Sequence, residues 1–306
     1  MKVIVAGGSG FIGKTLVERL MEQGHSVVVL TRSPGKLAGQ SRNLSAERWD
    51  GKTAGDWTRN LEGADAIVNL TGEPIAGKRW TRRQKDLILT SRIDSTRALV
   101  LAIERARRKP SVLINVSGVD IYDDRLYRAV TEEAPIGTGF LARVCAEWEA
   151  SALEAEQFGV RVVIPRMGVV LSRDGGALTR LMTPFRFFVG GYVGSGQQWF
   201  PWVHIEDVTS VFIFLLKNTD VRGPVNLAAP EHVTMKEFTK IMGRVLHRPS
   251  WTAVPAFILR LALGEMAEML LTGQRVVPQK LLNAGFTFTY QTTNKALADM
   301  LKREAL

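Results

Sequence analysis

The sequence of 306 residues lacks the marks of several protein classes. Its only cysteine, Cys145, has no partner for an internal disulfide, which fits a reducing compartment. Apolar runs such as residues 211–216 are far shorter than the ~20 residues of a membrane-spanning helix. The first residues show a strand pattern and no signal-peptide pattern. We therefore expect a cytoplasmic protein with no membrane partner.

Metal ligands are also scarce, because the four histidines are widely spaced and there is no cysteine pair. We expect no metal site. The net charge of +10 is compatible with nucleic acid or with a site for an anionic small ligand. The basic clusters 79–85 and 105–109 are short and lack the aromatic spacing of single-strand binders. The charge pattern thus favours an anionic ligand and no nucleic acid.

The first half of the chain alternates buried strand patterns with helix patterns. The strand patterns are continuously apolar, as in parallel strands covered on both faces, and occupy residues 3–6, 27–30, 66–70, 112–116 and 161–165. Helical spacing of apolar residues covers 11–23, 91–107 and 141–157. This alternation predicts an α/β fold, a Rossmann-type doubly wound parallel sheet.

Beyond residue 166 the pattern changes to glycine-rich turns and helices. The expected helices are residues 207–217, 234–246, 255–271 and 294–301. We interpret this part as a smaller, mostly helical C-terminal lobe. The predicted organisation is a nucleotide-binding domain, 1–165, and a substrate-binding lobe, 166–306, with elements interleaved between them.

A glycine-rich loop lies between the first strand and the first helix. Gly7 permits the tight turn, Gly10 lets the backbone approach a pyrophosphate, and Gly13 allows close packing of helix on strand. The free N–H groups and the positive dipole at the helix start then face the phosphates. The predicted cofactor contacts of this loop are Gly7, Ser9, Gly10, Phe11, Ile12 and Gly13.

The end of the second strand indicates which dinucleotide is bound. An NAD site usually has a carboxylate there, whereas this chain has Thr31 and Arg32. A guanidinium can bond the 2′-phosphate of NADP as a charge-assisted fork, and the Thr31 hydroxyl can assist. NADP(H) is therefore the predicted cofactor. The other interpretation is that Arg32 is simply exposed to solvent.

A third set of contacts is expected at the end of the strand 66–70. Ligands of open α/β sheets lie at the carboxyl ends of the strands. Leu70 and Thr71 would flank the adenosine ribose and phosphates, and Gly72 permits close approach. Glu73 is either a contact to a ribose or substrate hydroxyl or an ordinary loop carboxylate.

These segments, in this order, resemble the extended short-chain dehydrogenase/reductases. The whole chain is most similar to the epimerase-family group labelled nucleoside-diphosphate-sugar epimerase or cell-division-inhibitor-like. The resemblance is carried by residues 7–13, 69–73, 79–81, 91–92, 117–119, 184–186, 194–196, 200–205 and the C-terminal segment 273–280. It implies a hydride-transfer or epimerisation mechanism.

The superfamily uses a serine, a tyrosine that exchanges the proton, and a lysine four residues later that lowers the pKa of the tyrosine. Ser117 matches the serine. The resemblance places Leu141 and Cys145 where the tyrosine and lysine belong, and no YxxxK spacing occurs in the chain. Leucine has no proton to exchange, and cysteine brings no fixed positive charge. The usual catalytic pair is therefore missing.

Other residues are candidates for the missing roles. Tyr122 and Tyr127 are candidate phenolic acids, or simply loop aromatics. Arg92 is placed to reach the cofactor pyrophosphate or ribose. Arg166 and Val170 follow the strand where the resembled family lines the nicotinamide pocket. Cys145 is either a nucleophile or a buried, inert thiol.

The glycine- and aromatic-rich stretch 190–204 borders the substrate cleft in the resembled group. Trp199 and Trp202 are candidate stacking surfaces for a planar or sugar ring. His204 is either a proton carrier or a structural histidine at a helix start, and Glu206 or Asp207 is the expected N-cap.

The sequence leaves two functions open. One is an NADP(H)-dependent oxidoreductase or epimerase with non-standard acid/base groups. Its substrate would be a small polar molecule, either free or linked to a nucleotide. The other is a non-catalytic NADP(H)-binding sensor or regulator, linked to cell division as the family label suggests. Ser117 and the aromatic stretch favour the enzyme, and the missing tyrosine and lysine favour the sensor. The sequence does not indicate an oligomeric state.

Overall fold

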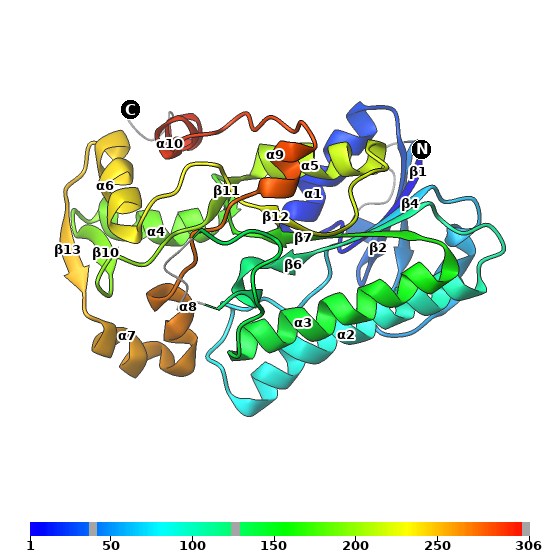
Figure 1. Cartoon of the computed structure of the whole chain (residues 1–306), viewed down its shortest axis with the longest axis horizontal. Coiled ribbons are helices and arrows are strands. Elements are labelled where there is room, and N and C mark those ends of the chain that lie inside the picture. Colours follow the sequence, from blue (N-terminus) through cyan, green and yellow to red (C-terminus); the bar gives the residue numbers. More distant parts are fainter. Residues whose placement is uncertain (37–41, 124–128, 302–306) are drawn as a thin grey trace.

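The computed structural model describes residues 1–36, 42–123 and 129–301. Its centre is a parallel sheet with the strand order β12-β7-β5-β4-β1-β2-β3, and β6 pairs with β7 (Figure 1). The strands are β1 (Lys2–Ala6), β2 (Ser26–Thr31), β3 (Leu44–Arg48), β4 (Ala66–Asn69), β5 (Val112–Asn115), β6 (Ser117–Gly118), β7 (Arg161–Met167) and β12 (Gly223–Leu227). The predicted doubly wound Rossmann-type fold is confirmed.

Helices cover both faces of this sheet, with α1 (Phe11–Glu22) and α5 (Ile205–Lys217) on one side and α2 (Arg82–Arg105) and α3 (Phe140–Leu153) on the other (Figure 1). Alternate residues of β1 point to the two faces. Val3 and Val5 pack in one buried cluster, whereas Ile4 and Ala6 pack in the other. All four are fully buried, which explains the continuously apolar strands.

Several elements differ from the sequence prediction. Helix α2 begins nine residues earlier than expected, because the side chain of Thr81 accepts a hydrogen bond from the Gln84 N–H and caps the helix there. Strand β3 was not predicted. It pairs with β2 alone at the edge of the sheet, and only Leu44 of its five residues is buried, so it has no apolar run.

The C-terminal lobe combines two small sheets with helices. One sheet has the order β11-β8-β9 and the other pairs β10 with β13. Its elements are β8 (Val169–Ser172), β9 (Gly175–Gly176), α4 (Ala177–Arg186), β10 (Gly190–Val193), β11 (Trp202–His204), α6 (Met235–Leu246), β13 (Ser250–Val254), α7 (Ala256–Leu263), α8 (Glu268–Leu271), α9 (Gln279–Asn283) and α10 (Thr293–Leu301). The expected helix 255–271 is interrupted at Gly264, whose φ of +63° breaks the helical path.

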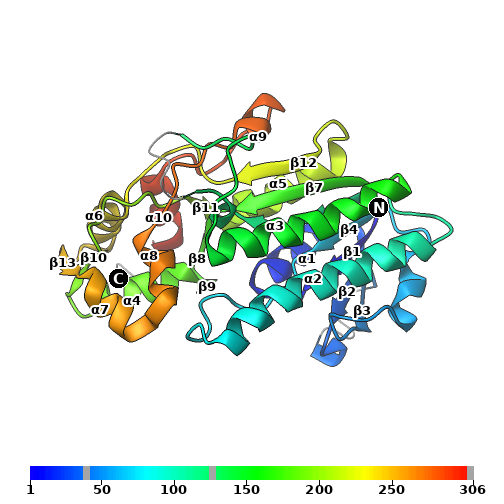
Figure 2. The same cartoon turned by 60° about the horizontal axis from the view of Figure 1, so that its bottom comes forward.

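The two lobes share elements, as Figure 2 shows from a second direction. Strand β7 runs across the predicted division at residue 165, and β12 returns from the second lobe to the edge of the main sheet. The division itself stays a prediction. Within the described residues, no helix has the length and apolar character to cross a membrane, and no group of three potential metal ligands occurs.

Candidate functional site

The glycine-rich loop joins β1 to α1 in a tight turn. Gly7 has a φ of +79°, and the Gly10 N–H donates to the Gly7 carbonyl at 2.9 Å. A Cβ at Gly13 would lie 2.4 Å from that same carbonyl oxygen, so only glycine fits there. Gly10 is the N-cap of α1, and no side chain caps the helix. The first N–H groups of α1 are therefore left to bind an anion.

The predicted contact sets meet at the carboxyl edge of the sheet. A Cβ on Gly7 would lie 3.1 Å from the Leu70 carbonyl carbon and 3.2 Å from the Thr71 N atom, so these two loops touch. The hydroxyls of Ser9 and Thr31 are 3.0 Å apart. The glycine loop, the end of β2 and the end of β4 thus form one continuous surface.

Arg32 follows β2 directly and its side chain is exposed. Within the described residues it has no hydrogen bond or ion pair. Thr31 is buried, and its hydroxyl accepts a hydrogen bond from the Ser33 N–H at 3.3 Å. The guanidinium is thus available to a ligand beside a well-positioned hydroxyl.

The Arg92 side chain, 7% exposed, lies beneath the loop that follows β4. Its Nη1 donates to the Glu73 carbonyl at 3.1 Å and to the Ile88 carbonyl at 2.9 Å. A Cβ on Gly72 would be 3.0 Å from the Arg92 Cζ atom, so Gly72 makes room for the guanidinium. Burial lowers the pKa of Arg92, and the nearby Cys145, Glu73 and Asp120 oppose that effect.

A buried polar network that the sequence analysis missed supports the same edge. The Asn69 amide donates to Asn115 at 2.6 Å and to Thr96 at 3.1 Å, and the Trp148 indole also donates to Thr96, at 2.9 Å. Because Asn69 and Asn115 end β4 and β5, the network fixes the two strand ends relative to α2 and α3. Two asparagines at equivalent strand ends were the available signal.

Ser117, Cys145 and Asp120 lie together at the end of β6. The Ser117 hydroxyl is buried beside the Cys145 thiol and has no well-formed hydrogen bond within the described residues. A Cβ on Gly118 would lie 3.4 Å from the Asp120 Oδ2 and 3.5 Å from the Cys145 Sγ. Burial raises the pKa of Cys145 to about 12 and also raises that of Asp120, which Arg92 partly lowers. Asp120 is partly exposed, and the sequence analysis did not single it out.

Tyr122 lies in a sealed network rather than in a cleft. Its hydroxyl donates to the Asn226 Oδ1 at 2.5 Å and accepts from the Arg166 Nη1 at 2.9 Å. The side chain is 2% exposed, and burial raises its pKa to about 12. Arg166 is itself bound to Glu149. This placement argues against Tyr122 as a proton donor to substrate and against Arg166 as a cofactor contact; Tyr127 lies outside the described residues.

The β8–β9 turn packs against the start of α1. A Cβ on Gly176 would lie 2.9 Å from the Phe11 ring and 3.3 Å from the Val170 carbonyl oxygen. Phe11 therefore packs against the second lobe, and Val170 lies next to that contact. These two predicted cofactor residues come together at the boundary between the glycine loop and the C-terminal lobe.

Two of the three predicted substrate contacts are buried in the C-terminal lobe. Trp202 is 1% exposed and packs among the apolar side chains of that lobe, so its ring belongs to the hydrophobic core. His204 is 2% exposed, and its Nδ1 accepts from the Glu206 N–H at 3.1 Å. His204 is therefore the N-cap of α5, and the prediction of a cap at Glu206 or Asp207 is wrong. The Asp207 carboxylate accepts instead from the backbone N–H groups of residues 289 and 290.

Trp199 is the predicted substrate contact that stays partly exposed. Its ring lies 6.5 Å from that of His232, and the Arg275 guanidinium is 5.5 Å from its centre. Arg275 belongs to the C-terminal segment 273–280. An aromatic face beside a cation can stack on a planar or sugar ring. The stacking role stays a prediction.

Comparisons with known proteins agree with this geometry. A model of the NAD dependent epimerase/dehydratase family matches residues 3–228, and a domain of unknown function matches residues 254–300. An epimerase family protein of Staphylococcus haemolyticus is 40% identical over 299 residues, covering 97% of this chain and 98% of the relative. A chloroplastic epimerase family protein of Arabidopsis thaliana is 39% identical over 307 residues, covering 99% of this chain and 87% of the relative.

A solved structure has the same fold over its full length. The crystal structure of the human epimerase family protein SDR39U1 with NADPH superimposes with a TM-score of 0.89 at 33% identity. The match covers 99% of each chain.

Proposed function

Because this chain belongs to the NAD dependent epimerase/dehydratase family, we propose that it binds NADP(H) at the carboxyl edge of its main sheet. The observation that carries the proposal is Arg32, an exposed and unpaired guanidinium at the end of β2, where no carboxylate is present. The human relative solved with NADPH supports the same choice of dinucleotide. The uncapped start of α1 would hold the pyrophosphate, and Arg32 with Thr31 would hold the 2′-phosphate.

Calorimetric titration with NADPH and NADH tests this assignment. Arg32→Ala removes a charge-assisted hydrogen bond worth roughly 1.5–3 kcal/mol, so NADPH affinity should fall about 10- to 150-fold while NADH affinity stays unchanged. Arg105→Ala, at the far end of α2, is the matched control and should change neither affinity. Equal weakening of NADPH and NADH binding by Arg32→Ala would refute the assignment.

For the reaction, we propose an oxidoreductase or epimerase acting on a small polar substrate, with Asp120 in place of the missing acid. When bound, NADPH supplies a hydride. Asp120 is a partly exposed residue beside Ser117, and burial of its carboxyl raises the pKa, which favours the protonated form that can donate to a substrate oxygen. Arg92 holds the neighbouring Glu73 loop in place and limits the rise in the pKa of Asp120.

A non-catalytic NADP(H) sensor is the second candidate. It is favoured by the burial of Ser117 and Tyr122 and by Leu141 and Cys145 in the positions of the tyrosine and lysine. None of these four side chains offers a solvent-accessible proton near neutral pH. Under this proposal the redox state of the bound dinucleotide would be the signal.

One set of assays separates the two proposals. The purified chain with NADPH is incubated with a panel of carbonyl compounds and sugar nucleotides, alongside Asp120→Asn and Ser117→Ala. Turnover that falls about 100-fold or more in Asp120→Asn, with NADPH affinity unchanged, supports the enzyme. Tight NADPH binding without turnover of any compound supports the sensor. Turnover that Asp120→Asn leaves intact removes Asp120 from the proposal.

A further inference from the structure

The far end of the C-terminal lobe exposes an unusual concentration of large apolar side chains. Phe187, Phe188 and Val189, which follow α4, are 73%, 54% and 49% exposed, and Trp251 on β13 is 70% exposed. They are neighbours, because the Trp251 indole donates to the Phe188 carbonyl at 3.2 Å. We call these four residues the distal patch. In Figure 1 this end of the molecule, with β10, β13 and α6, lies opposite β1 and β2.

Helix α7, which begins directly after β13, also exposes apolar side chains. None of its residues is buried, and Phe257 and Leu261, one turn apart, are 70% and 80% exposed. Trp251 is the most exposed tryptophan of the chain. Apolar side chains gathered in this way normally mark a contact surface.

Backbone strain coincides with the distal patch. Phe188 and His247 are the two non-glycine residues with positive φ in the described chain, at 62° and 53°. A bulky aromatic residue in this region of φ is energetically costly. The conformation nevertheless keeps Phe188 exposed, and the Arg248 guanidinium lies 4.4 Å from the centre of its ring.

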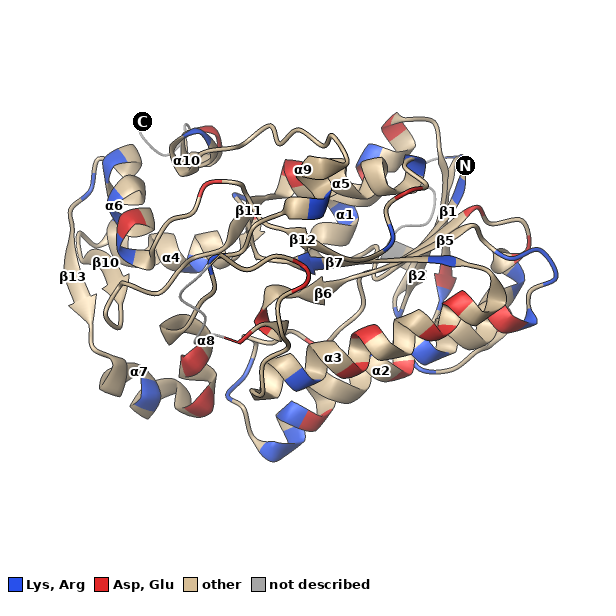
Figure 3. Ribbon diagram, viewed as in Figure 1, with Lys and Arg blue, Asp and Glu red and all other residues tan. Residues whose placement is uncertain are grey.

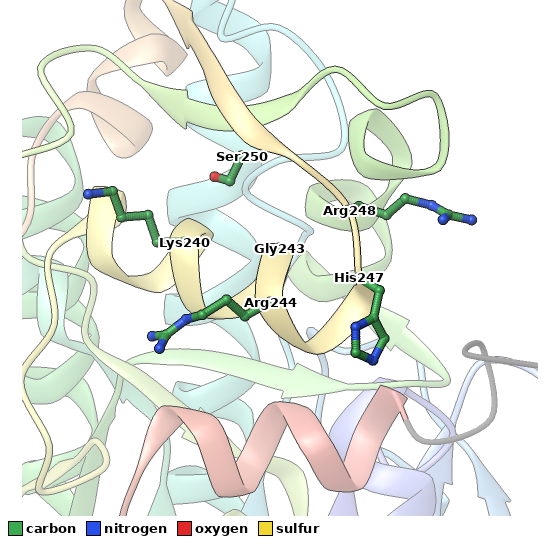
Figure 4. A pocket seen from close by; sticks show the side chains of 6 residues that line it. All are labelled: Lys240, Gly243, Arg244, His247, Arg248 and Ser250. Carbon is green, nitrogen blue, oxygen red and sulfur yellow. The ribbon is translucent and has the colours of Figure 1, made fainter.

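Cations border the distal patch on the side of α6. Lys240, Arg244 and Arg248 line an open depression of about 660 Å³, together with Gly243, His247 and Ser250 (Figure 4). Their charged ends spread apart rather than converge on one point, which suits an extended anionic surface better than a single small anion. None of the three forms an ion pair within the described residues. Figure 3 shows that basic residues outnumber acidic ones along α6.

We propose that the distal patch docks on an anionic lipid surface. The aromatic side chains would insert at the level of the headgroups, and Lys240, Arg244 and Arg248 would bind the anionic lipids. The sequence predicted no membrane partner because no segment is long enough to span a bilayer. A peripheral contact needs no spanning segment, so the proposal replaces that prediction.

The charge of the patch argues against a second copy of this chain as its occupant. Two copies related by a two-fold axis would bring the same three unpaired cations face to face. Like charges at an interface oppose association, whereas an anionic bilayer neutralises them. The depression and the aromatic residues therefore fit a negatively charged partner that also accepts apolar side chains.

Cosedimentation of the full chain with lipid vesicles tests the proposal. We expect binding to vesicles that contain phosphatidylserine, no binding to pure phosphatidylcholine, and weakening by salt. Arg244→Gln with Arg248→Gln should weaken binding about 25-fold, because each basic residue near an anionic surface contributes a factor of about five. Phe187→Ser with Trp251→Ser should also weaken it. Arg105→Gln with Arg108→Gln, a basic pair without exposed aromatic neighbours, is the matched control and should have little effect.

A spectroscopic measurement on the unmodified chain tests lipid contact without the charge and serine variants, and it needs only one conservative variant to assign the signal. Brominated lipids in phosphatidylserine vesicles should quench tryptophan fluorescence, and most of the quenching should disappear in Trp251→Phe. Sedimentation with neither kind of vesicle overturns the proposal, as does equal binding to both. Self-association that Trp251→Ser abolishes would overturn it in favour of a second copy.

Discussion

Glu149 and Arg166 form a two-point ion pair in the interior of the protein. The Arg166 Nε and Nη2 donate to the two Glu149 carboxylate oxygens at 2.9 and 2.8 Å. The Arg166 side chain is 5% exposed and the Glu149 side chain is 7% exposed. The pair joins α3 to β7, and Arg166 also bonds Tyr122. It therefore ties α3 to the buried network that continues through Tyr122 to Asn226 on β12.

Removing one member of this pair should destabilise the fold strongly. Glu149→Gln leaves the guanidinium without its countercharge in a buried site, which typically costs about 3–5 kcal/mol. Urea unfolding measures the loss. Arg143→Gln is the control, because Arg143 pairs with Glu147 on the exposed side of the same helix, and such a pair contributes only about 0.3–0.5 kcal/mol. Similar losses in the two variants would contradict the structural role given to Glu149.

The glycine loop offers a test of close packing. Gly13→Ala would place a Cβ 2.4 Å from the Gly7 carbonyl oxygen and 2.6 Å from the Gly8 Cα, and both neighbours are backbone atoms that cannot rotate away. We expect a loss of about 1–3 kcal/mol in stability, as in overpacked cores, together with the loss of NADPH binding by titration. Gly55→Ala is the matched control, since its Cβ would meet only the Trp57 ring at 3.8 Å. Normal NADPH affinity in Gly13→Ala would show that the loop is not the phosphate site.

The fold could be predicted in outline because the buried strands of the main sheet have continuously apolar sequences. The edge strand β3 could not be predicted, because it depends on tertiary contacts with β2. The break of the helix at Gly264 could not be predicted either, because it depends on the conformation of one glycine. The tight turn of the glycine loop is local in sequence and was predictable for that reason, whereas its role in binding phosphate stays a prediction. The position of Tyr122 was not, because its burial depends on Arg166 and Asn226, residues 44 and 104 positions away.

His204 should make stability depend on pH. Burial lowers its pKa from 6.5 to about 4, and Asp299 opposes this only partly. Protonation therefore favours the unfolded chain. The stabilising contribution is complete above pH 6.5 and is lost as the pH falls toward 4, by up to about 3 kcal/mol. Urea unfolding at a series of pH values measures it.

His204→Asn separates this histidine from the other titrating groups. Asparagine can still cap α5 but does not titrate. The stability of the His204→Asn protein should therefore fall less steeply between pH 6.5 and 4. His247→Asn, at an exposed position with positive φ that asparagine tolerates, should keep the full pH dependence. If His204→Asn and the unmodified protein lost stability in parallel, His204 would not be the group responsible.

Cys145 should be inert in the folded protein. Burial raises the pKa of its thiol to about 12, with Asp120 adding to the shift, so almost none is thiolate at neutral pH. As the only cysteine of the chain, it gives an unambiguous signal with a thiol-reactive dye. We expect labelling only at the rate of unfolding and rapid labelling in urea. Fast labelling of the native protein would mean an accessible thiolate, and would restore Cys145 as a candidate nucleophile beside Ser117.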